Sequence, residues 1–595
     1  MKHLLLIALL FAAASLYAGN DKPLSFCNPI NIDYGWGGPA QSGSFRTAAD
    51  PVIVLFKGRY YLFTTLDRGG YRSSTDLVHW QNHSFNSEVV SSVMSRDGYM
   101  APAVTADSNY VYFINFRGED PNKQIGVIRT ADPFHGKWEL CGMTRCMADP
   151  CLLFDDGKAY VYYGLGENNP TRVFQADKTF APIPGTERIV RPGIADISTC
   201  KEGYQRGRRE LFGEIEVPDS SFHFHNLPCT EGVWVTKHDG SYYLQYATPG
   251  TLSQWYCDVL LKSSLPDEGF RLEPYNPVSM KVGGFVGSAG HSCVFQDRYG
   301  NSWEVTTMWV GNHDLFERRI GLFPVTYDRQ GRMRVHTVLG DYPMPMPNRK
   351  FTDADIMTTG WMLQSFRKAC HASSSMESHP ASNAVDENSH TWWAAATGNP
   401  GEYFAVDFGK EVEVDAVQVN FADEGKATGE DYHAYRVFYS SDWHEWKLLI
   451  DKSYNRQSVP HDYVALKQRV RAKALKIENE HTPKGQKFAL LDFRVFGKGK
   501  GRKPVSVNSL RASRNKGDRR MAHLSWSPSA NANGYMVRFG YQPDFLNQCI
   551  QINDSGKTDL NIHILISDQD YYYRIDSFNE NGITKGTLVS DKASR

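Results

Sequence analysis

The sequence predicts an all-β protein with a five-bladed β-propeller first and two β-sandwiches after it. Three observations lead to this prediction: a five-fold internal repeat, a change of pattern after residue 348, and another change at a basic linker. A chain of 595 residues is too long for one hydrophobic core, because domains usually hold about 100–200 residues. We therefore expect several domains.

The repeat consists of two short apolar runs separated by a turn, followed by a further hairpin. The copies begin DPVIVLFKGRYYLFTT, APAVTADSNYVYFINF, DPCLLFDDGKAYVYYG, EGVWVTKHDGSYYLQYA and HSCVFQDRYGNSWEVTTM. Each copy is typical of four antiparallel strands. Five such units predict a propeller over residues 19–348, with the innermost strands running along a central channel.

The residues that lead the five units carry ionisable groups. If the first strand of each unit is innermost, these residues meet at the mouth of the channel. They are Asp50, Ala101, Asp149, Glu231 and His291. A strand can start at Asp-Pro for conformational reasons alone, but that alternative does not explain three carboxylates and an imidazole together. The set indicates a chemical function.

Residues 26–348 resemble glycoside hydrolase family 43, whose members are five-bladed propellers. The resemblance depends on the motifs AADP, ADPCLLFDDGKAYVYYG, EGVWVTK, GSYYLQYATPG and GHS. Carried over by motif, it implies that Asp50 is the general base, that Glu231 is the general acid, and that Asp149 tunes the pKa of that acid. Cleavage of a glycosidic bond needs one protonated and one ionised carboxyl, and a third carboxylate raises the pKa of the acid.

The same resemblance implies an inverting, exo-acting enzyme that removes terminal sugars from plant-type polysaccharides. The expected sugar is α-L-arabinofuranose, followed by β-D-xylose or a galactose-type unit. The chemistry needs no cofactor. One alternative is a carbohydrate-binding propeller without catalysis, and another is a cell-surface adhesion protein.

Further residues are candidates for substrate binding. His291 matches the central histidine of the family, which holds water or calcium in the channel. Trp36 lies among glycines and Trp234 follows the acid motif, although packing is the commoner role for a tryptophan. Arg318, in FERRIGLFP, can direct a guanidinium toward the channel, with a structural ion pair as the alternative. The acid motif departs from the usual Glu-Gly-Pro, because Val233 replaces the proline.

Two further domains follow the propeller. Residues 349–497 resemble a discoidin (F5/8 type C) domain, a jelly-roll sandwich shared with carbohydrate-binding module family 32, on SNAVDENSHTWWAA, GEYFAVDFGKEVEVDAVQVNF and LLDFRVFG. After a linker at 498–504, residues 505–595 resemble a fibronectin type III sandwich on AHLSWSPSANANGYMVRFG and YYYRIDSFNENGIT. We expect both domains to be self-contained, so that hydrolysis of small substrates survives truncation after Asn348.

The discoidin resemblance also implies a structural calcium ion. Asp386 and Thr391 match positions that often bind calcium through oxygen atoms. Asp492 stands where that family commonly has a glutamate. Trp393 fits a core position, whereas Trp392 is an additional tryptophan.

The rest of the sequence indicates export and a glycan partner. Residues 1–18, MKHLLLIALLFAAASLYA, have the form of a secretory signal peptide, and no later stretch is long and charge-free enough to span a bilayer. We expect a monomer in the periplasm or outside the cell. The net charge of -1 gives no field for nucleic acid. His223 and His225, in an insertion before Glu231, lack a third metal ligand at a readable spacing.

Overall fold

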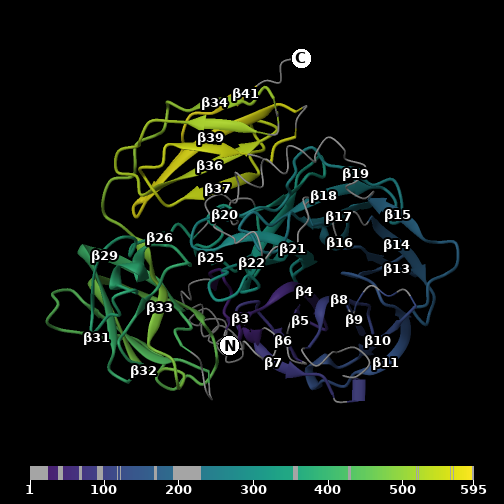
Figure 1. Ribbon diagram of the computed structural model, residues 1–595, viewed down its shortest axis with the longest axis horizontal. Helices are drawn as coiled ribbons and strands as arrows, with labels where there is room; N and C mark the ends of the chain where they lie inside the picture. Colours follow the sequence, from purple (N-terminus) through teal and green to yellow (C-terminus); the bar gives the residue numbers. More distant parts are fainter. Residues whose placement is uncertain are drawn as a thin grey trace, which may run out of the picture.

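The chain folds almost wholly into β-structure, as the sequence predicts (Figure 1). The computed structural model describes residues 24–591, apart from 38–44, 66–69, 87, 90–97, 117, 119, 121, 166–169, 192–228, 353–358, 426–430, 518, 520, 563, 567 and 568. Short 3₁₀ helices occur at η1 (Pro133–His135) and η3 (Ala381–Val385). Across these described residues, no helix has the length and apolarity that a membrane crossing requires. The expected signal peptide and the histidines of the insertion lie outside them.

The first domain is built from successive sets of four antiparallel strands, arranged around a common centre in Figure 1. The first two sets are β4 (Ala49–Phe56), β5 (Arg59–Thr65), β6 (Gly70–Ser74), β7 (Gln81–Ser84), and β8 (Met100–Ala106), β9 (Val111–Phe116), β10 (Gln124–Thr130), β11 (Glu139–Arg145). The third is β12 (Cys151–Asp155), β13 (Lys158–Tyr163), β14 (Thr171–Ala176), β15 (Arg188–Arg191). The last two are β16 (Glu231–His238), β17 (Ser241–Thr248), β18 (Cys257–Ser263), β19 (Arg271–Leu272), and β21 (Gly287–Gln296), β22 (Ser302–Trp309), β23 (Arg318–Tyr327), β24 (Met333–Val335). A parallel bridge from Cys257 to Ala289 joins these last two sets in one sheet.

Local sequence explains the first hairpin of several sets. The turns Lys57-Gly58, Asp156-Gly157 and Asp239-Gly240 each link two strands with two residues, and both residues have positive φ. This is the backbone of a type I′ turn, whose twist matches that of the flanking strands. Short additional strands support the domain: β2 (Gly35–Gly37) pairs with β3 (Phe45–Thr47), and β1 (Ser25–Phe26) pairs with β25 (Met344–Pro345).

The second domain is a β-sandwich with a buried apolar interior, drawn in green in Figure 1. Its strands are β26 (Met362–Leu363), β27 (Ala369–Ala372), β28 (Trp393–Ala394), β29 (Tyr403–Phe421), β30 (Ala434–Ser440), β31 (Lys447–Asp451), β32 (His461–His481) and β33 (Ala489–Lys498). Trp393 is fully buried beside Phe404 and Phe488, which confirms its predicted core position. Trp392 is half-buried, and its indole N–H donates to Glu424 at 2.9 Å.

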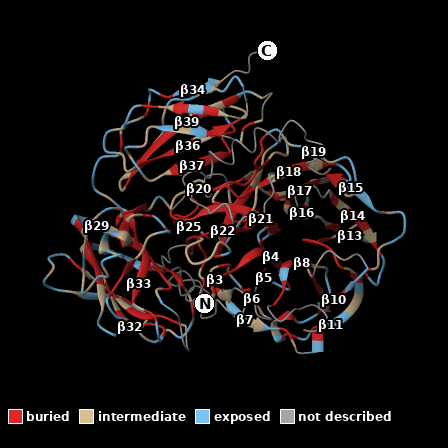
Figure 2. Ribbon diagram, viewed as in Figure 1, coloured by how far each residue is buried: buried red, intermediate tan, exposed pale blue. Residues whose placement is uncertain are grey.

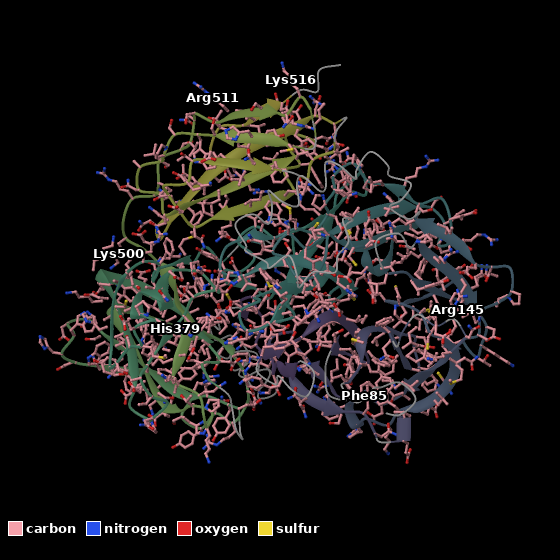
Figure 3. All side chains as sticks on the ribbon, in the orientation of Figure 1. Phe85, Arg145, His379, Lys500, Arg511 and Lys516 are labelled. Atoms are coloured by element: carbon pink, nitrogen blue, oxygen red, sulfur yellow. The ribbon has the colours of Figure 1, made fainter. Side chains whose placement is uncertain are left out.

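The third domain consists of two packed sheets, drawn in yellow in Figure 1. One sheet contains β34 (Arg511–Arg514), β35 (Ala522–Ser525) and β38 (Asp559–Ile562). The other contains β36 (Gly534–Gly540), β37 (Gln548–Ile552), β39 (Tyr571–Asn579), β40 (Gly582–Thr584) and β41 (Val589–Asp591). Trp526 and Tyr573 are buried in its core, as predicted. Figure 3 shows Arg511 and Lys516 on the side of this domain that faces away from the first domain.

The three domains share apolar cores, which contradicts the expectation that the C-terminal half is self-contained. A strand of the first domain, β20 (Val282–Gly283), extends the sheet of the third domain by pairing in parallel with β37. One buried cluster contains Cys27 of the first domain, Phe496 of the second and Phe578 of the third. Figure 2 shows buried residues continuing across these junctions. Truncation after Asn348 would expose this shared surface, so we expect the shortened chain to lose its fold.

Buried charges also connect the first two domains. Arg46 contacts Asp423 at 3.2 Å, and Arg319 Nε lies 2.6 Å from His461 Nε2. Arg494 of the second domain donates to the carbonyl of Asp341 at 2.6 Å. Buried charges need partners, so these contacts fix the two domains against each other.

Candidate active site

A bulge at the start of an inner strand directs the candidate side chains. In β4 the pairing register shifts between Ala49 and Val52, and comparable shifts occur at the start of β8, β16 and β21. The residue inside each bulge has a left-handed backbone conformation. Asp149, two residues before β12, has the same conformation. These residues are Asp50, Ala101, Asp149, Gly232 and His291. A bulge re-aims a side chain, so the repeated bulge is the device that turns these positions toward one another.

In the fourth set of strands, the alignment of the repeat units made from the sequence is wrong by one residue. Gly232 occupies the left-handed position, and Glu231 precedes it. The alignment of the repeat units placed Glu231 of EGV at the position of Asp50 in DPV. The backbone conformation instead places Gly232 at that position. A Cβ at Gly232 would lie 2.5–2.8 Å from the ring of His291. Glycine therefore makes room for the imidazole.

Asp50 is held by donors and cations. Its Oδ2 accepts from Thr65 Oγ1 at 2.5 Å, and its Oδ1 lies 3.1 Å from His291 Nδ1 and 3.7 Å from Arg318 Nη1. Burial raises the pKa of Asp50, but the charges of His291 and Arg318 and the Thr65 hydrogen bond outweigh it, so the pKa lies below its usual range. The environment of Asp50 favours a carboxylate.

Glu231 lies in the opposite kind of environment. Burial is the main reason that its pKa is raised, and the charge of Asp50 adds to it, although His291 and the Tyr256 hydrogen bond act against the shift. The hydroxyl of Tyr256 donates to Glu231 Oε1 at 2.6 Å. Tyr256 therefore fixes one oxygen of the carboxyl group, while the thiol of Cys229 lies 3.9 Å from the other.

Asp149 is buried between these groups. Its Oδ2 accepts from the backbone N–H of Gly232 at 3.0 Å and lies 4.0 Å from His291 Nδ1. Burial raises the pKa of Asp149 to about 7, and the charges of Glu231 and Asp50 contribute to this rise. The structure thus gathers the three predicted carboxylates around one imidazole.

Two more buried acids lie behind this group, and sequence reasoning missed them. Asp258 accepts from the backbone N–H of His291 at 3.0 Å, while Gln245 donates to Asp258 at 3.4 Å and to Glu304 at 2.8 Å. Burial raises the pKa of Asp258 to about 7 and that of Glu304 to about 8. The signal for Glu304 was an acid inside the otherwise uncharged strand SWEVTTMW.

The two neighbouring arginines of FERRIGLFP have separate roles. Arg318 faces the carboxylates, and it also donates to Thr251 at 3.2 Å. Its Nε is buried and has no hydrogen-bond partner among the described residues. Arg319 instead bonds Glu317 and His461 at the domain interface. Both alternatives that the sequence left open therefore occur, one at each residue.

The two candidate tryptophans have contacts outside the carboxylate group. The Trp36 indole donates to Asp431 of the second domain at 2.6 Å, and Arg46 lies over its ring at 4.5 Å. Trp234 donates to the carbonyl of Val294 at 3.2 Å and packs between the fourth and fifth sets. These are packing contacts, and a role in substrate binding stays a prediction for both.

The predicted calcium ligands in the second domain bond to each other. Thr391 Oγ1 donates to Asp386 Oδ2 at 2.7 Å, and burial raises the pKa of Asp386 to about 6. Asp492 accepts from the backbone N–H of Glu387 at 2.8 Å. No group of three or more His, Cys, Asp or Glu side chains suited to a metal occurs in the described ranges.

Comparisons with known proteins identify the first two domains. Residues 45–333 match the model of Glycosyl hydrolases family 43, and residues 369–492 match the F5/8 type C domain. The chain therefore contains a family 43 domain followed by an F5/8 type C domain.

Individual relatives are distant. An arabinoxylan arabinofuranohydrolase of Paenibacillus polymyxa is 25% identical over 319 residues, which cover 44% of this chain and 44% of that protein. The chain thus matches less than half the length of this curated relative. A xylan β-1,4-xylosidase structure from Bacillus halodurans has a TM-score of 0.38 and 13% identity, covering 80% of this chain and 100% of the other. An α-L-arabinofuranosidase structure from Clostridium thermocellum has a TM-score of 0.33 and 20% identity, covering 48% and 93%. The family 43 match, together with the arabinofuranohydrolase relative, supports a glycosidase.

Proposed function

We propose that this protein is an inverting, exo-acting glycoside hydrolase that removes terminal sugars from plant-type polysaccharides. Asp50 is the general base, Glu231 the general acid and Asp149 the carboxylate that tunes the acid. The five sets of four strands are the blades of a propeller, and the third domain is a fibronectin type III module.

The observation that carries this proposal is the opposite effect of the site on Asp50 and Glu231. Arg318 and His291 favour the ionised form of Asp50, whereas burial favours the protonated form of Glu231. Glycoside cleavage by inversion needs one carboxylate to take a proton from water and one acid to protonate the leaving oxygen. Pairs of carboxyl groups with separated pKa values are the usual sign of such a division of roles.

The proton donor and the proton acceptor assigned here are those that a single displacement needs. A water molecule gives its proton to Asp50 as its oxygen attacks the anomeric carbon, and Glu231 gives its proton to the departing oxygen. Tyr256 donates to one oxygen of Glu231, so the transferable proton belongs on the other. Inversion requires about 6.5–9.5 Å between the two carboxyl groups, which leaves room for the water.

We propose α-L-arabinofuranose as the sugar, ahead of β-D-xylose or a galactose-type unit. The arabinoxylan arabinofuranohydrolase relative supports this order. We also propose that the protein is exported to the periplasm or beyond, acts as a monomer and needs no cofactor for the chemical step. Calcium, if bound, has a structural role.

The test is a screen of the purified full chain against aryl glycosides, arabinans, xylans and arabinogalactans. We expect release of terminal pentose, with proton NMR showing a first product of inverted anomeric configuration. A first product that retains the configuration would contradict the role of Asp50 as base. No turnover of any substrate would favour the non-catalytic carbohydrate-binding alternative.

A further inference from the structure

A large cleft separates the first set of strands from the second domain. It has a volume of 1220 Å³ and is lined by residues before and within β7 and by the loop and strand around residues 452–467. Pockets for ordinary small ligands enclose about 300–1,000 Å³. The cleft therefore has room for an extended molecule.

Aromatic rings from both domains form part of its wall. Trp80 of the first domain and Trp361 of the second are half-buried, and each packs against a hydrophobic cluster while lining the cleft. Tyr463 lines it as well. Rings backed by a core are rigid apolar surfaces, which suits the flat C–H faces of sugar rings.

Five amide side chains are among the polar residues of the lining: Asn31, Gln81, Asn82, Asn455 and Gln457. Gln81, Asn82 and Gln457 line the cleft and are exposed. The side-chain amide both donates and accepts hydrogen bonds, as a sugar hydroxyl does. Rings together with amides thus match both kinds of surface on a carbohydrate.

The charges of the lining balance. Three carboxylates and three Lys or Arg side chains line the cleft: Asp33, Asp431, Asp462, Lys452, Arg456 and Lys467. Lys452 and Asp462 pair at 3.2 Å. A balanced lining gives no net field for a polyanion, so a neutral ligand fits better than an acidic polymer.

Asp431, one of the residues lining the cleft, contacts a strand pair that precedes β4 in the chain. Asp431 lines the cleft and accepts from the Trp36 indole. Trp36 pairs with Arg46 on β3, and the next strand, β4, carries Asp50. A ligand in the cleft would therefore lie near the strands that lead to the general base.

We propose that this interdomain cleft is a second glycan-binding site, which holds a neutral polysaccharide chain while the active site acts on the same polymer. The choice of ligand rests on the proposed function. Both domains supply the wall, so the site exists only in the docked full chain.

The test measures binding of soluble arabinoxylan to the full chain carrying Glu231→Gln, in which turnover is slower by about 10² to 10⁴. Ala465→Trp fills the cleft from an exposed position without removing any packing, and Trp80→Ala removes one ring. We expect each to weaken binding about tenfold or more in affinity electrophoresis or calorimetry. Tyr454→Ala is the control, because Tyr454 is an aromatic residue of the same domain, 85% exposed and outside the cleft lining, and it should bind as the parent does.

The same substitutions in the chain with intact Glu231 separate this inference from the proposed function. Aryl-glycoside turnover should stay unchanged while KM for arabinoxylan rises. Unchanged arabinoxylan binding in a folded Ala465→Trp protein would overturn the cleft site, whatever the activity. Weakened binding in a protein that hydrolyses no glycoside would support the cleft and refute the proposed enzyme.

Discussion

Two groups of buried charged residues in this molecule differ in their ratio of acidic to basic side chains. The candidate active site holds five acids against two basic side chains: Asp50, Asp149, Glu231, Asp258 and Glu304 against His291 and Arg318. At and near the domain interface, four buried acids each pair with a cation: Arg46 with Asp423, Arg319 with Glu317, Arg494 with Glu387, and Lys281 with Asp341. Both groups are buried, so burial alone does not separate function from structure.

The pKa values of Glu317 and Asp149 show what the balance of charge does. At the interface, burial alone would raise the pKa of Glu317, but His313 and Arg319 lower it to about 2. In the active site, burial and neighbouring acids raise the pKa of Asp149 to about 7. A surplus of buried acid is costly unless protons remain bound. The protein retains such a surplus in the active site, where an acid and a base are needed, and also beside Arg494, where burial and Glu387 raise the pKa of Asp492.

The largest expected effect comes from the two central carboxyl groups. Asp50→Asn and Glu231→Gln should each lower kcat on aryl glycosides by about 10² to 10⁴, the usual contribution of a positioned acid or base. For Glu231→Gln, the loss should shrink when the leaving group is an activated phenol that needs no proton. The melting temperature should not fall for Glu231→Gln, because burial already disfavours the charge of Glu231, whereas Asp50→Asn loses contacts with His291 and Arg318, so its fold is checked by circular dichroism. A loss of less than tenfold in both variants would contradict the assigned roles.

The interface should respond in stability instead of activity. Arg494→Met leaves the buried Glu387 without its partner at 2.6 Å, and breaking a buried pair costs about 3–5 kcal/mol. Chemical denaturation of the full chain measures this loss. Arg436→Met is the matched control, since the pair of Arg436 and Glu480 is partly exposed and such pairs contribute about 0–1 kcal/mol. Equal effects of the two variants would show that the interface pair does not stabilise the docked domains.

Gly232 tests whether backbone shape supports the acid cluster. Gly232→Ala places a Cβ against the His291 ring at a backbone with φ of 63°, so we expect kcat to fall about tenfold or more. Gly157→Ala is the control, because Gly157 has φ of 72° but no atom within 4 Å of the added Cβ. Both variants carry backbone strain, and only the first should lose activity. A similar loss in both would mean that strain, and not His291, is responsible.

The sequence predicted the repeat and the three carboxylates because both leave local signals. A hairpin needs its turn residues, as in Asp156-Gly157, and an acid before a buried strand stands out in the sequence. The one-residue offset at Gly232 was missed because a bulge depends on pairing with β17, which sequence alone does not show. Asp258 and Tyr256 were missed for a similar reason: they come from the third strand region of the set and meet the site only in three dimensions.

Domain independence was the expectation that failed, and its cause is also non-local. The linker at 498–504 is basic and rich in glycine, which is typical of a flexible connection. The cluster that joins Cys27, Phe496 and Phe578 draws on residues hundreds of positions apart. Apolar residues of this kind look the same in sequence whether they pack within a domain or between domains.

The smallest expected effect is a difference in the pH dependence of stability, and it compares the two groups of charges directly. The pKa of Asp149 is about 7 in the folded chain against 3.8 for a free aspartate, so between these values the folded state holds a proton that the unfolded state has lost. Stability therefore falls as pH rises through this window, and the full penalty applies above pH 7. Asp149→Asn removes the penalty, and a single pKa unit is worth about 1.4 kcal/mol. We expect the variant to be more stable than the parent at pH 8, with the difference vanishing as pH falls toward 4. Glu317→Gln should behave in the opposite way. Its folded pKa of about 2 lies below the ordinary 4.5, so its contribution is complete above pH 4.5 and is lost as pH falls toward 2. Urea denaturation from pH 2 to pH 8 covers both windows, and a destabilised Asp149→Asn protein at pH 8 would show that the site is balanced for an ionised Asp149 after all.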